Sequence, residues 1–304
     1  MDDDELFPSH PFTTVQARHL GIERRRLDEA VAQGRVLRPM RGAYRLASVA
    51  ATPLVRAQTV RLVTSATSVV CDRTAAWLWE VDCLRFAELD GTPPVESCVL
   101  RGHQATERQQ VDGVTRDLLP EDWVELGGVR VTTPLRTAAD LGCRLWAPRA
   151  LGVMDALMRA HGFTQGDLQR LLSRYRRRRG VVQLRSLVAM VDARAESQPE
   201  SWVRWFIVSE GHPCPEPQVW VLVEGQWYRL DLSYPHARIL VEYDGEEFHL
   251  RTAEQREHDE RRREALRRVG WVVIVVTREG LTVEGQSAWL SELRDALRSR
   301  RVHV

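Results

Sequence analysis

Apolar and polar residues alternate with a changing period along the last third of the chain, and this pattern predicts a small α/β domain. Ser197 and Pro199 start a helix whose apolar face also carries Glu200. Three following runs with a period of two, QVWVLV, QWYRLDLSY and RILVEYD, predict strands. A second helix from Thr252 to Val269 and the fully apolar strand WVVIVVT complete the order αβββαβ.

The runs QWYRLDLSY and RILVEYD determine which acidic residues lie together in this domain. Glu242 and Asp244 are two positions apart, so both side chains point to the same face of their strand. A turn centred between His236 and Ala237 places Asp231 directly opposite Glu242 on the neighbouring strand. We therefore expect the three carboxylates to converge.

Carboxylates gathered on one face of a sheet repel each other unless a cation lies among them. Mg²⁺ (or Mn²⁺) binds oxygen ligands, polarises a phosphate and lowers the pKa of a bound water, so the pattern indicates metal-dependent phosphodiester hydrolysis. The expected metal ligands are Asp231, Glu242 and Asp244. A structural alternative stays open, in which these acids only form ion pairs with Arg229, Arg238 and Arg262.

The first 50 residues carry two short helical patterns followed by two short strands. Thr13 or Thr14 can cap a helix that runs through His19, and a second helix extends from Glu23 to Gln33. RVLRPMRGAYRL then predicts a basic hairpin, which completes a winged helix-turn-helix with its second helix in the major groove of DNA. The expected DNA contacts are Arg25, Arg26, Arg38 and Arg41. A small helical domain with a solvated arginine face is the alternative.

Residues 55–190 are the least informative part of the sequence. TAAWLWEV predicts a helix, VELGGVRVTT a hairpin and residues 135–161 two further helices, without a grouping of residues that indicates chemistry. The run RYRRRRG, from Arg174 to Gly180, ends a helix. It is either a solvated linker or a contact to the DNA backbone.

Composition and charge indicate a folded protein without a membrane segment. The 304 residues are 43% apolar and 28% charged, with neither a long apolar run nor a leader, so we expect a cytoplasmic protein of several domains. The five cysteines are scattered and form no C-x-x-C motif, which argues against a disulfide framework or a zinc site. All 43 basic residues are arginines, and a net charge of +1 is compatible with local basic patches.

The amino-terminal pattern resembles a known family. FTTVQARHLGIERRRLDEAVAQGRVLRPMRGAYRL is similar to the amino-terminal domain of AbiEi-type antitoxins from abortive-infection systems, through its T-x-x-Q-A entry, its G-R-V exit and the R-G-x-Y at the wing. The following region, especially VTTPLRTAADL, resembles the rest of that architecture. The resemblance implies double-stranded DNA as a partner, and a toxin or another defence-system protein as a further one.

The carboxyl-terminal pattern resembles the PD-(D/E)XK nuclease superfamily. Within it, DLSYPHARILVEYDGEEFH, followed by R-x-x-D-x-x-R and GWVVIVVT, is similar to small domains related to very-short-patch repair endonucleases. This likeness implies that Asp231 is the principal metal ligand and that His249 is the catalytic base. It gives supporting roles in the site to Glu200, Glu242, Asp259 and Arg262. The lysine of the superfamily's E-x-K is absent, because Asp244 stands in its place.

Together these patterns predict an α/β protein, α+β overall. It would comprise a winged helix-turn-helix over residues 10–50, an antitoxin-like mixed α/β middle domain over 55–190 and a restriction-endonuclease-like domain over 197–304. The function we expect from the sequence is a metal-dependent DNA endonuclease in phage defence, restriction or repair. The alternative is a DNA-binding antitoxin or transcriptional regulator whose nuclease-like domain is inactive. RNA as the substrate of the same site is a third, weaker interpretation.

Overall fold

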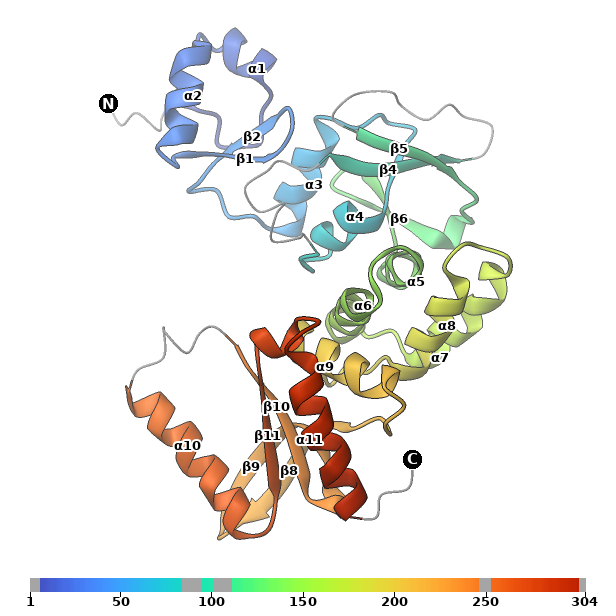
Figure 1. Cartoon of the computed structure of the whole chain (residues 1–304). Coiled ribbons are helices and arrows are strands. Elements are labelled where there is room, and N and C mark those ends of the chain that lie inside the picture. The colour runs from blue at the N-terminus through green and yellow to red at the C-terminus, as the bar shows by residue number, and fades with distance from the viewer. Residues whose placement is uncertain (1–5, 84–93, 101–110, 246–252, 301–304) are drawn as a thin grey trace. The chain divides into compact units, whose positions relative to one another are not determined.

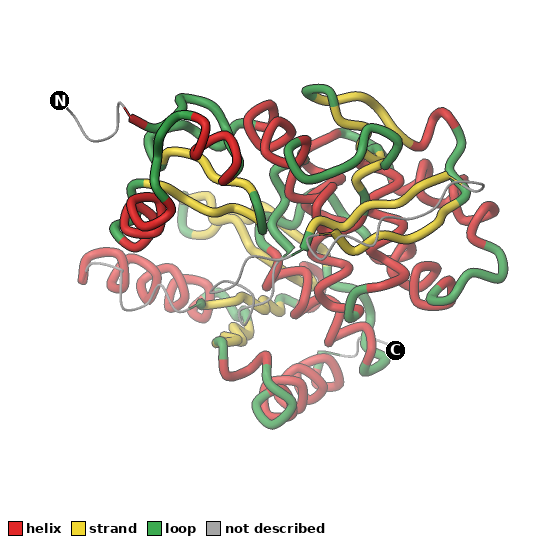
Figure 2. Tube along the Cα trace, turned by 90° about the horizontal axis from the view of Figure 1, so that it is seen from above, coloured by secondary structure: helices red, strands yellow, loops and turns green. Residues whose placement is uncertain are grey.

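The computed structural model describes residues 6–83, 94–100, 111–245 and 253–300 (Figure 1). The chain divides into two compact units, Met1–Leu141 and Gly142–Val304. In both units helices (red in Figure 2) border the strands (yellow). The boundary falls inside the predicted middle domain, and the division into three domains stays a prediction. The mixture of helices and strands confirms the α+β class.

The winged helix-turn-helix forms the start of the first unit, as the sequence predicts. Its elements are α1 (Thr14–His19), α2 (Arg24–Ala32), β1 (Val36–Met40) and β2 (Ala43–Leu46). Thr13 caps α1 in a capping box with Gln16. Gly21 and Gly34 end the two helices with φ of +77° and +72°, values that glycine adopts without steric cost.

A small core of its own holds this region together. Leu27 and Ala30 of α2 are buried together with Phe12 and Tyr44. The backbones of Phe12 and Tyr44 exchange two hydrogen bonds of 2.8 Å, which attach the segment before α1 to the hairpin. The helical face opposite Leu27 and Ala30 therefore points to solvent.

A five-stranded mixed sheet forms the rest of the first unit. Its elements are α3 (Pro53–Arg61), β3 (Val69–Val70), α4 (Asp72–Leu78), β4 (Val95–Leu100), β5 (Val111–Arg116), η3 (Pro120–Asp122), β6 (Trp123–Leu126), β7 (Val129–Thr132) and α5 (Pro134–Arg144). The strand order is β5-β4-β3-β7-β6. The predicted hairpin around Gly127 and Gly128 is confirmed as β6 and β7.

A buried ion-pair network joins α4, β5 and α5 in this unit. Arg116 contacts Asp72 at 2.5 Å and Asp140 at 2.8 Å. Arg136 contacts Asp140 and Asp122, each at 2.9 Å. Arginines and acids that are distant in the sequence compensate each other's charge here, which allows them to be buried. Sequence patterns gave no sign of this network, because its members come from four separate segments.

The second unit contains helices α6 to α9, a sheet with two flanking helices, and short 3₁₀ turns. Its elements are α6 (Ala147–His161), α7 (Gln165–Leu171), η4 (Leu172–Tyr175), α8 (Val181–Met190), α9 (Gln198–Ser209), β8 (Glu216–Val223), β9 (Gln226–Tyr234), η5 (Pro235–Ala237), β10 (Ile239–Asp244), α10 (Ala253–Arg268), β11 (Val272–Thr277), η7 (Glu279–Leu281) and α11 (Gln286–Ser299). The strand order is β11-β10-β9-β8, with β10 and β11 parallel. The predicted order αβββαβ is confirmed.

Helices cover both faces of this sheet. On one face α9 and α11 pack on a core that includes Leu232 and Val241. On the other face α10 packs on a core that includes Leu230 and Leu240. Leu230 and Leu232 would share a face in a regular strand, yet they lie in different cores. Strand β9 therefore changes sides at Asp231, which is the residue between them.

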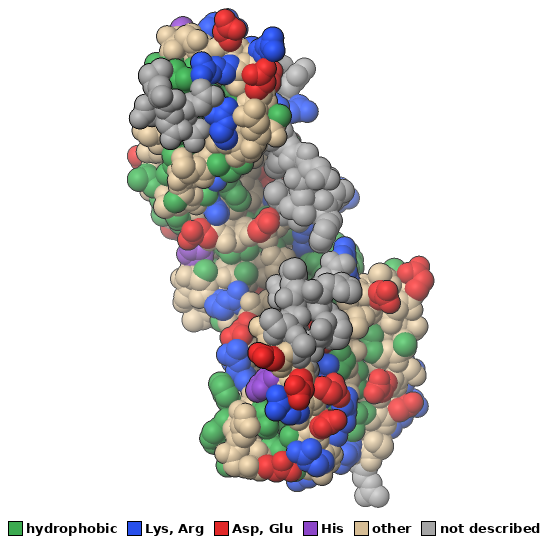
Figure 3. Space-filling view, turned by 90° about the vertical axis from the view of Figure 1, so that its left-hand side faces the viewer, with side chains coloured by type: hydrophobic (Ala, Val, Ile, Leu, Met, Phe, Trp, Pro, Cys, Tyr) green, Lys and Arg blue, Asp and Glu red, His purple; other side chains and the backbone are tan. Residues whose placement is uncertain are grey.

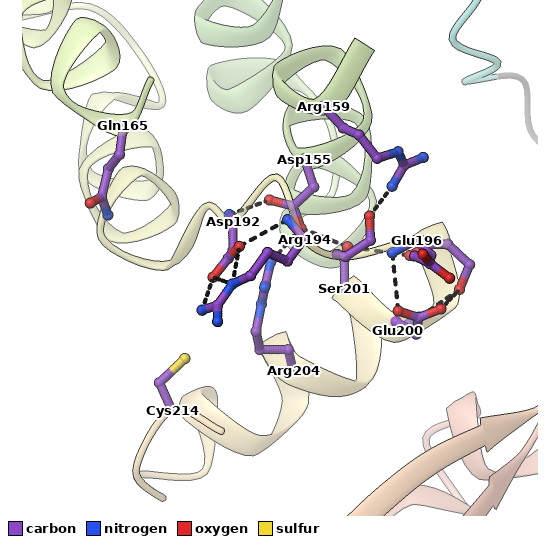
Figure 4. Close-up of polar contacts among 12 residues, drawn as sticks. Asp155, Arg159, Gln165, Asp192, Arg194, Glu196, Glu200, Ser201, Arg204 and Cys214 are labelled. Atoms are coloured by element: carbon purple, nitrogen blue, oxygen red, sulfur yellow. Dashed lines mark hydrogen bonds and ion pairs between the residues drawn. The ribbon is translucent and has the colours of Figure 1, made fainter. Parts of the chain in front are cut away.

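A buried ion pair connects α6 to α9. Figure 4 shows Ser201 and Arg204 of α9 directed towards Asp155 of α6. Arg204 and Ser201 both donate to Oδ2 of Asp155, and the backbone N–H of Asp192 donates to Oδ1 at 2.8 Å. Burial raises the pKa of Asp155 to about 6, although Arg204 acts in the opposite direction. The sequence gave no sign of this pair either.

Candidate nucleic-acid interface

The four arginines predicted to contact DNA all lie at the surface of the winged helix. Arg25 and Arg26 are exposed on α2, because Leu27 and Ala30 turn the opposite face of that helix into the core. Arg38 is exposed on β1, and Arg41 is exposed in the turn between β1 and β2. The helix and the hairpin thus both expose arginines, as expected for a winged-helix DNA-binding domain. The contact with DNA itself stays a prediction.

Acidic residues accompany the arginines of α2. Arg24 and Arg25 form ion pairs of 2.9 Å with Asp28 and Glu29, one helical turn further on. Such exposed pairs contribute little to stability, so the guanidinium groups can exchange their carboxylates for phosphates. In Figure 3 basic (blue) and acidic (red) side chains lie close together in the upper part, where Figure 1 shows α1 and α2. Arg24 was not among the arginines predicted to contact DNA, although it belongs to the same run of three arginines.

The hairpin before β10 confirms the predicted register of the acidic residues. Ile239 pairs with Tyr234, Leu240 with Ser233 and Val241 with Leu232, which is the predicted register, and the observed pairing ends one position before Asp231 and Glu242. The turn consists of η5 and Arg238, which takes a left-handed conformation with φ of +50°. The sequence therefore predicted the correct strand alignment.

Arginines from α10 bind both oxygens of Glu242 and Oδ2 of Asp244, two of the predicted metal ligands. Arg263 donates from Nε to Glu242 at 2.5 Å and from a terminal nitrogen to Asp244 at 2.6 Å. Arg262 donates to the other oxygen of Glu242. Both acids are buried, and their charges are compensated by these pairs. The structural alternative holds for Glu242 and Asp244, with Arg263 as a partner that the sequence analysis missed.

The structural alternative also paired Arg229 and Arg238 with the acids, but both arginines have other partners. Arg229 pairs with Glu196 at 2.6 Å, and Arg238 donates to the backbone carbonyl of Val269 at 2.9 Å. These two ion pairs of the structural alternative are therefore not present among the described residues. Arg229 is exposed on β9, and Arg238 is exposed in the turn before β10.

Glu200 is buried as predicted, and its oxygens have local partners. Oε1 accepts from the hydroxyl of Ser197 at 2.8 Å. Oε2 accepts from the side chain of Gln218 at 2.9 Å and from the N–H of Glu196 at 3.1 Å. These bonds fix the start of α9, where an acid is also favoured by the helix dipole.

The pKa of Asp231 shows the effect of neighbouring carboxylates. Burial, together with the nearby carboxylates of Glu200 and Glu242, raises the pKa of Asp231 to about 7. Arg262 and Arg229 act in the opposite direction.

Arginines compete with a divalent metal ion for two of these acids. Both oxygens of Glu242 and Oδ2 of Asp244 bind guanidinium groups of α10. Over the ranges that the structure describes, no group of three His, Cys, Asp or Glu side chains is arranged to hold a metal. Asp259 lies half-buried on α10, and His249 lies outside the described residues. Mg²⁺ (or Mn²⁺) stays a prediction without support from this geometry.

Comparison with protein families gives two matches, both within the first 190 residues of the chain. Residues 4–47 match the family model described as "Transcriptional regulator, AbiEi antitoxin", and residues 68–190 match "AbiEi antitoxin C-terminal domain". The first match covers the winged helix-turn-helix, and the second ends with α8. Two segments of the chain are thus similar to AbiEi antitoxin domains, as the resemblance in its sequence implied.

Two curated proteins of Mycobacterium tuberculosis, from two strains, are similar to part of the chain. They are the uncharacterized proteins MT2308 and Rv2248, each 32% identical over 152 residues. The alignment covers 50% of this chain and 56% of each relative. The chain therefore spans little more than half the length of these relatives. Across the described residues, no helix is long and apolar enough to cross a membrane.

These findings correct the expected function. Both matched models describe an antitoxin, one of them as a transcriptional regulator, and neither describes a nuclease. The prediction of a metal-dependent endonuclease, and with it of a hydrolase, is therefore wrong. A fused nuclease domain related to very-short-patch repair enzymes is likewise unsupported. The error has a physical reason. The sequence pattern suggested that a metal ion neutralises the acids, whereas arginines of α10 form ion pairs with them.

Proposed function

We propose that this protein is a DNA-binding transcriptional regulator of the antitoxin type, which binds double-stranded DNA through its winged helix. The observation that carries the proposal is the exposure of the four predicted DNA-contacting arginines on α2 and the β1–β2 hairpin. It is supported by the transcriptional-regulator model, which matches this same segment. The protein would act in the cytoplasm, where its DNA is accessible.

The two arginine groups would have different roles in DNA binding. An α-helix fits the major groove, so α2 would enter it with Arg25 and Arg26 near the base edges and flanking phosphates. Arg38 and Arg41 of the wing would contact the neighbouring backbone. Arg38 also lies 5.8 Å from the ring of Tyr44, a buried residue, which restricts the direction of its side chain.

The remaining domain would serve as an interaction module for a toxin or another defence-system protein. Support comes from the acids of β10, which pair with arginines, and from the described residues, none of which form a group arranged to hold a metal ion. A folded domain that accompanies a DNA-binding domain is suited to binding a partner.

Salt dependence of DNA binding tests the proposal. Full-length protein is titrated with fluorescent duplex DNA between about 50 and 200 mM salt, and log K is plotted against log salt. Each neutralised phosphate contributes about 0.9 to the slope, so the pair R25A and R26A should flatten it by nearly 2. The matched control is R267A, since Arg267 is also an exposed helical arginine paired with a glutamate. An unchanged slope in the double variant would refute the winged-helix contact.

A further inference from the structure

The β8–β9 hairpin exposes three large apolar side chains on one face of its sheet. Trp220, Leu222 and Trp227 are 58%, 57% and 60% exposed. Leu222 lies directly opposite Trp227, and Trp220 is two positions before Leu222, so the three side chains point to the same side. We call these three residues the hairpin patch. More than half of each side chain is in contact with water, and a contiguous apolar surface of this kind marks an interaction site.

The two faces of this hairpin differ in how they are covered. On one face Val221, Val223 and Tyr228 pack with Leu266 of α10. The hairpin patch lies on the other face, where α9 and α11 cover the sheet, but the core beneath these two helices includes none of its three residues. The helices of this domain therefore leave the patch open.

Strand β8 is also an edge of its sheet. The strand order is β11-β10-β9-β8, and across the described residues no further strand pairs with the outer side of β8. Val223 and Gln226 close the hairpin around a two-residue turn, which makes them a hydrogen-bonded pair. Because this pattern alternates along a strand, Trp220 and Leu222 direct their backbone N–H and C=O groups to the free side.

This edge lacks the usual protection against pairing with another chain. Edge strands are generally protected by charged side chains, by proline or by a bulge. In β8 such features lie at the start, where Pro217 is followed by Gln218 with φ of +56°. The stretch from Val219 to Val223 is uncharged and wholly apolar. A second strand can therefore pair with it without burying a charge.

We propose that β8 pairs antiparallel with β8 of a second copy of this chain, around a two-fold axis at Val221, and that the hairpin patch forms the centre of this dimer interface. In this register Val221 meets the same residue of the second copy, and Trp220 meets the partner's Leu222. Both residues of the second pair direct their backbone groups outwards, so they can exchange two hydrogen bonds. The two sheets then form one continuous sheet.

Charge favours this register over the neighbouring one. An axis at Val221 sets Glu224 opposite the partner's Gln218. An axis at Trp220 would instead set Glu216 opposite the partner's Glu224, and like charges that lie directly opposite are destabilising. A second copy is favoured over an unrelated strand because the same uncharged edge and the same apolar patch then supply both sides of the interface.

The size of the hairpin patch predicts a weak, reversible dimer. At 58% and 60% exposure, Trp220 and Trp227 together leave on the order of 250 Å² of surface per copy open to water. Two copies double this area, and Leu222 and the backbone edge add to it, which approaches about 1,000 Å², the lower end of specific interfaces. We therefore expect a dissociation constant in the micromolar range. The inference does not rest on the proposed function, because this pairing needs no DNA.

Sedimentation velocity of the full chain, free of nucleic acid, tests the inference. Between about 1 and 100 µM the mass should rise from 34.8 kDa towards twice that value. A mass that stays at 34.8 kDa over the whole range would assign the edge to a different protein and would overturn the inference. A series of ever larger species would also overturn it, since a two-fold interface closes at two copies.

Two lysines on the free edge should abolish the dimer. The double variant W220K and L222K should stay monomeric at the highest concentration, because charged side chains block edge-to-edge pairing. Both positions are mostly exposed, so the melting temperature of the dilute protein should hardly change. The matched control is V182K with V283K, at exposed apolar positions of the same unit, and it should dimerise like the wild type. Equal losses of dimer in the two double variants would refute the hairpin patch as the interface.

Disulfide cross-linking tests the position of the two-fold axis. Opposed residues have Cβ atoms about 5 Å apart, close to the separation that a disulfide requires. In a C214S background, which removes an exposed thiol, V221C should form a linked dimer on mild oxidation and V283C should not. A dimer that V221C does not link, or that V283C links equally, would contradict the axis at Val221. The wing variant R25A and R26A should dimerise like the wild type, so the inference and the proposed function fail independently.

Discussion

Arg263 and Glu242 form an ion pair of 2.5 Å between α10 and β10, with side chains only 12% and 3% exposed. The same guanidinium also binds Asp244. Because a buried charge needs a partner, this arrangement explains how two acids two residues apart can occupy a strand of the core. It also makes Arg263 the residue on which the stability of the domain should depend most.

Replacing Arg263 by alanine should destabilise the protein by about 3 kcal/mol, because Glu242 and Asp244 would remain buried without their shared partner. The free energy of unfolding from urea titration measures the effect. Arg261 is an exposed neighbour on the same helix, and R261A should change stability by less than about 0.5 kcal/mol. Adding E242Q to R263A should recover part of the loss. Equal losses for R263A and R261A would show that the pair is not important.

The stability of the wild type should fall as Asp231 ionises. Its pKa is about 7 in the folded protein against an ordinary value of 3.8. The proton is thus held more tightly in the folded state, so the stability that this group contributes is complete below about pH 4 and is lost as the pH rises through 7. D231N removes the charge and should be more stable than the wild type at pH 8, by on the order of 2 kcal/mol, but not at pH 4.

Melting curves of wild type and D231N across this pH range provide the measurement for Asp231. The variant D28S, which replaces an exposed acid, serves as the control. Its stability relative to the wild type should not change comparably between pH 4 and pH 8. A wild type that is more stable than D231N at pH 8 would contradict the raised pKa.

Mg²⁺ should not stabilise the protein specifically. Both oxygens of Glu242 and Oδ2 of Asp244 bind arginines, so an ion that used these three oxygens would have to displace guanidinium groups. We expect equal melting temperatures in MgCl₂ and in NaCl of the same ionic strength, and no change on adding EDTA. A rise in MgCl₂ that D231N abolishes would restore the metal site as a possibility.

Gly180 should tolerate no side chain. Its φ of +83° and the carbonyl oxygen of Cys143, 2.1 Å from the position of a Cβ, both exclude alanine. G180A should therefore destabilise the second unit by more than about 2 kcal/mol. Gly162 has φ of +70° but open space around it, so G162A should show only the conformational cost of about 1 kcal/mol. Similar losses of stability for G180A and G162A would mean that the short distance between Gly180 and the Cys143 carbonyl of α5 is not important.

The order of elements and the register of the acid-bearing hairpin were determined by the sequence alone. Periodicity fixes whether a segment is helix or strand, and turn residues fix where strands begin, since both act over a few residues. The alignment of Leu232 with Val241 followed from the length of one turn. The exposure of Arg25 and Arg26 followed likewise from the apolar stripe of α2.

Which arginine meets which acid was decided only by the tertiary structure. Arg261, Arg262 and Arg263 are consecutive, and successive residues of a helix point about 100° apart. The pattern of α10 could not show that Arg263 binds both strand acids, because this depends on how the helix is rotated on the sheet. The sequence therefore revealed buried acids but not their partners, and a metal ion was inferred where arginines lie.

The change of side at Asp231 and the buried networks also depend on long-range packing. Asp155 meets Arg204, and Arg116 meets Asp72, across 49 and 44 residues of sequence. A local pattern shows only that such a residue is polar, because its burial and its partner depend on how distant segments fold together. The sequence determined the secondary structure and the exposed arginines of the winged helix. The tertiary structure decided which charges compensate each other, because compensation of buried charge acts between segments that only the fold brings into contact.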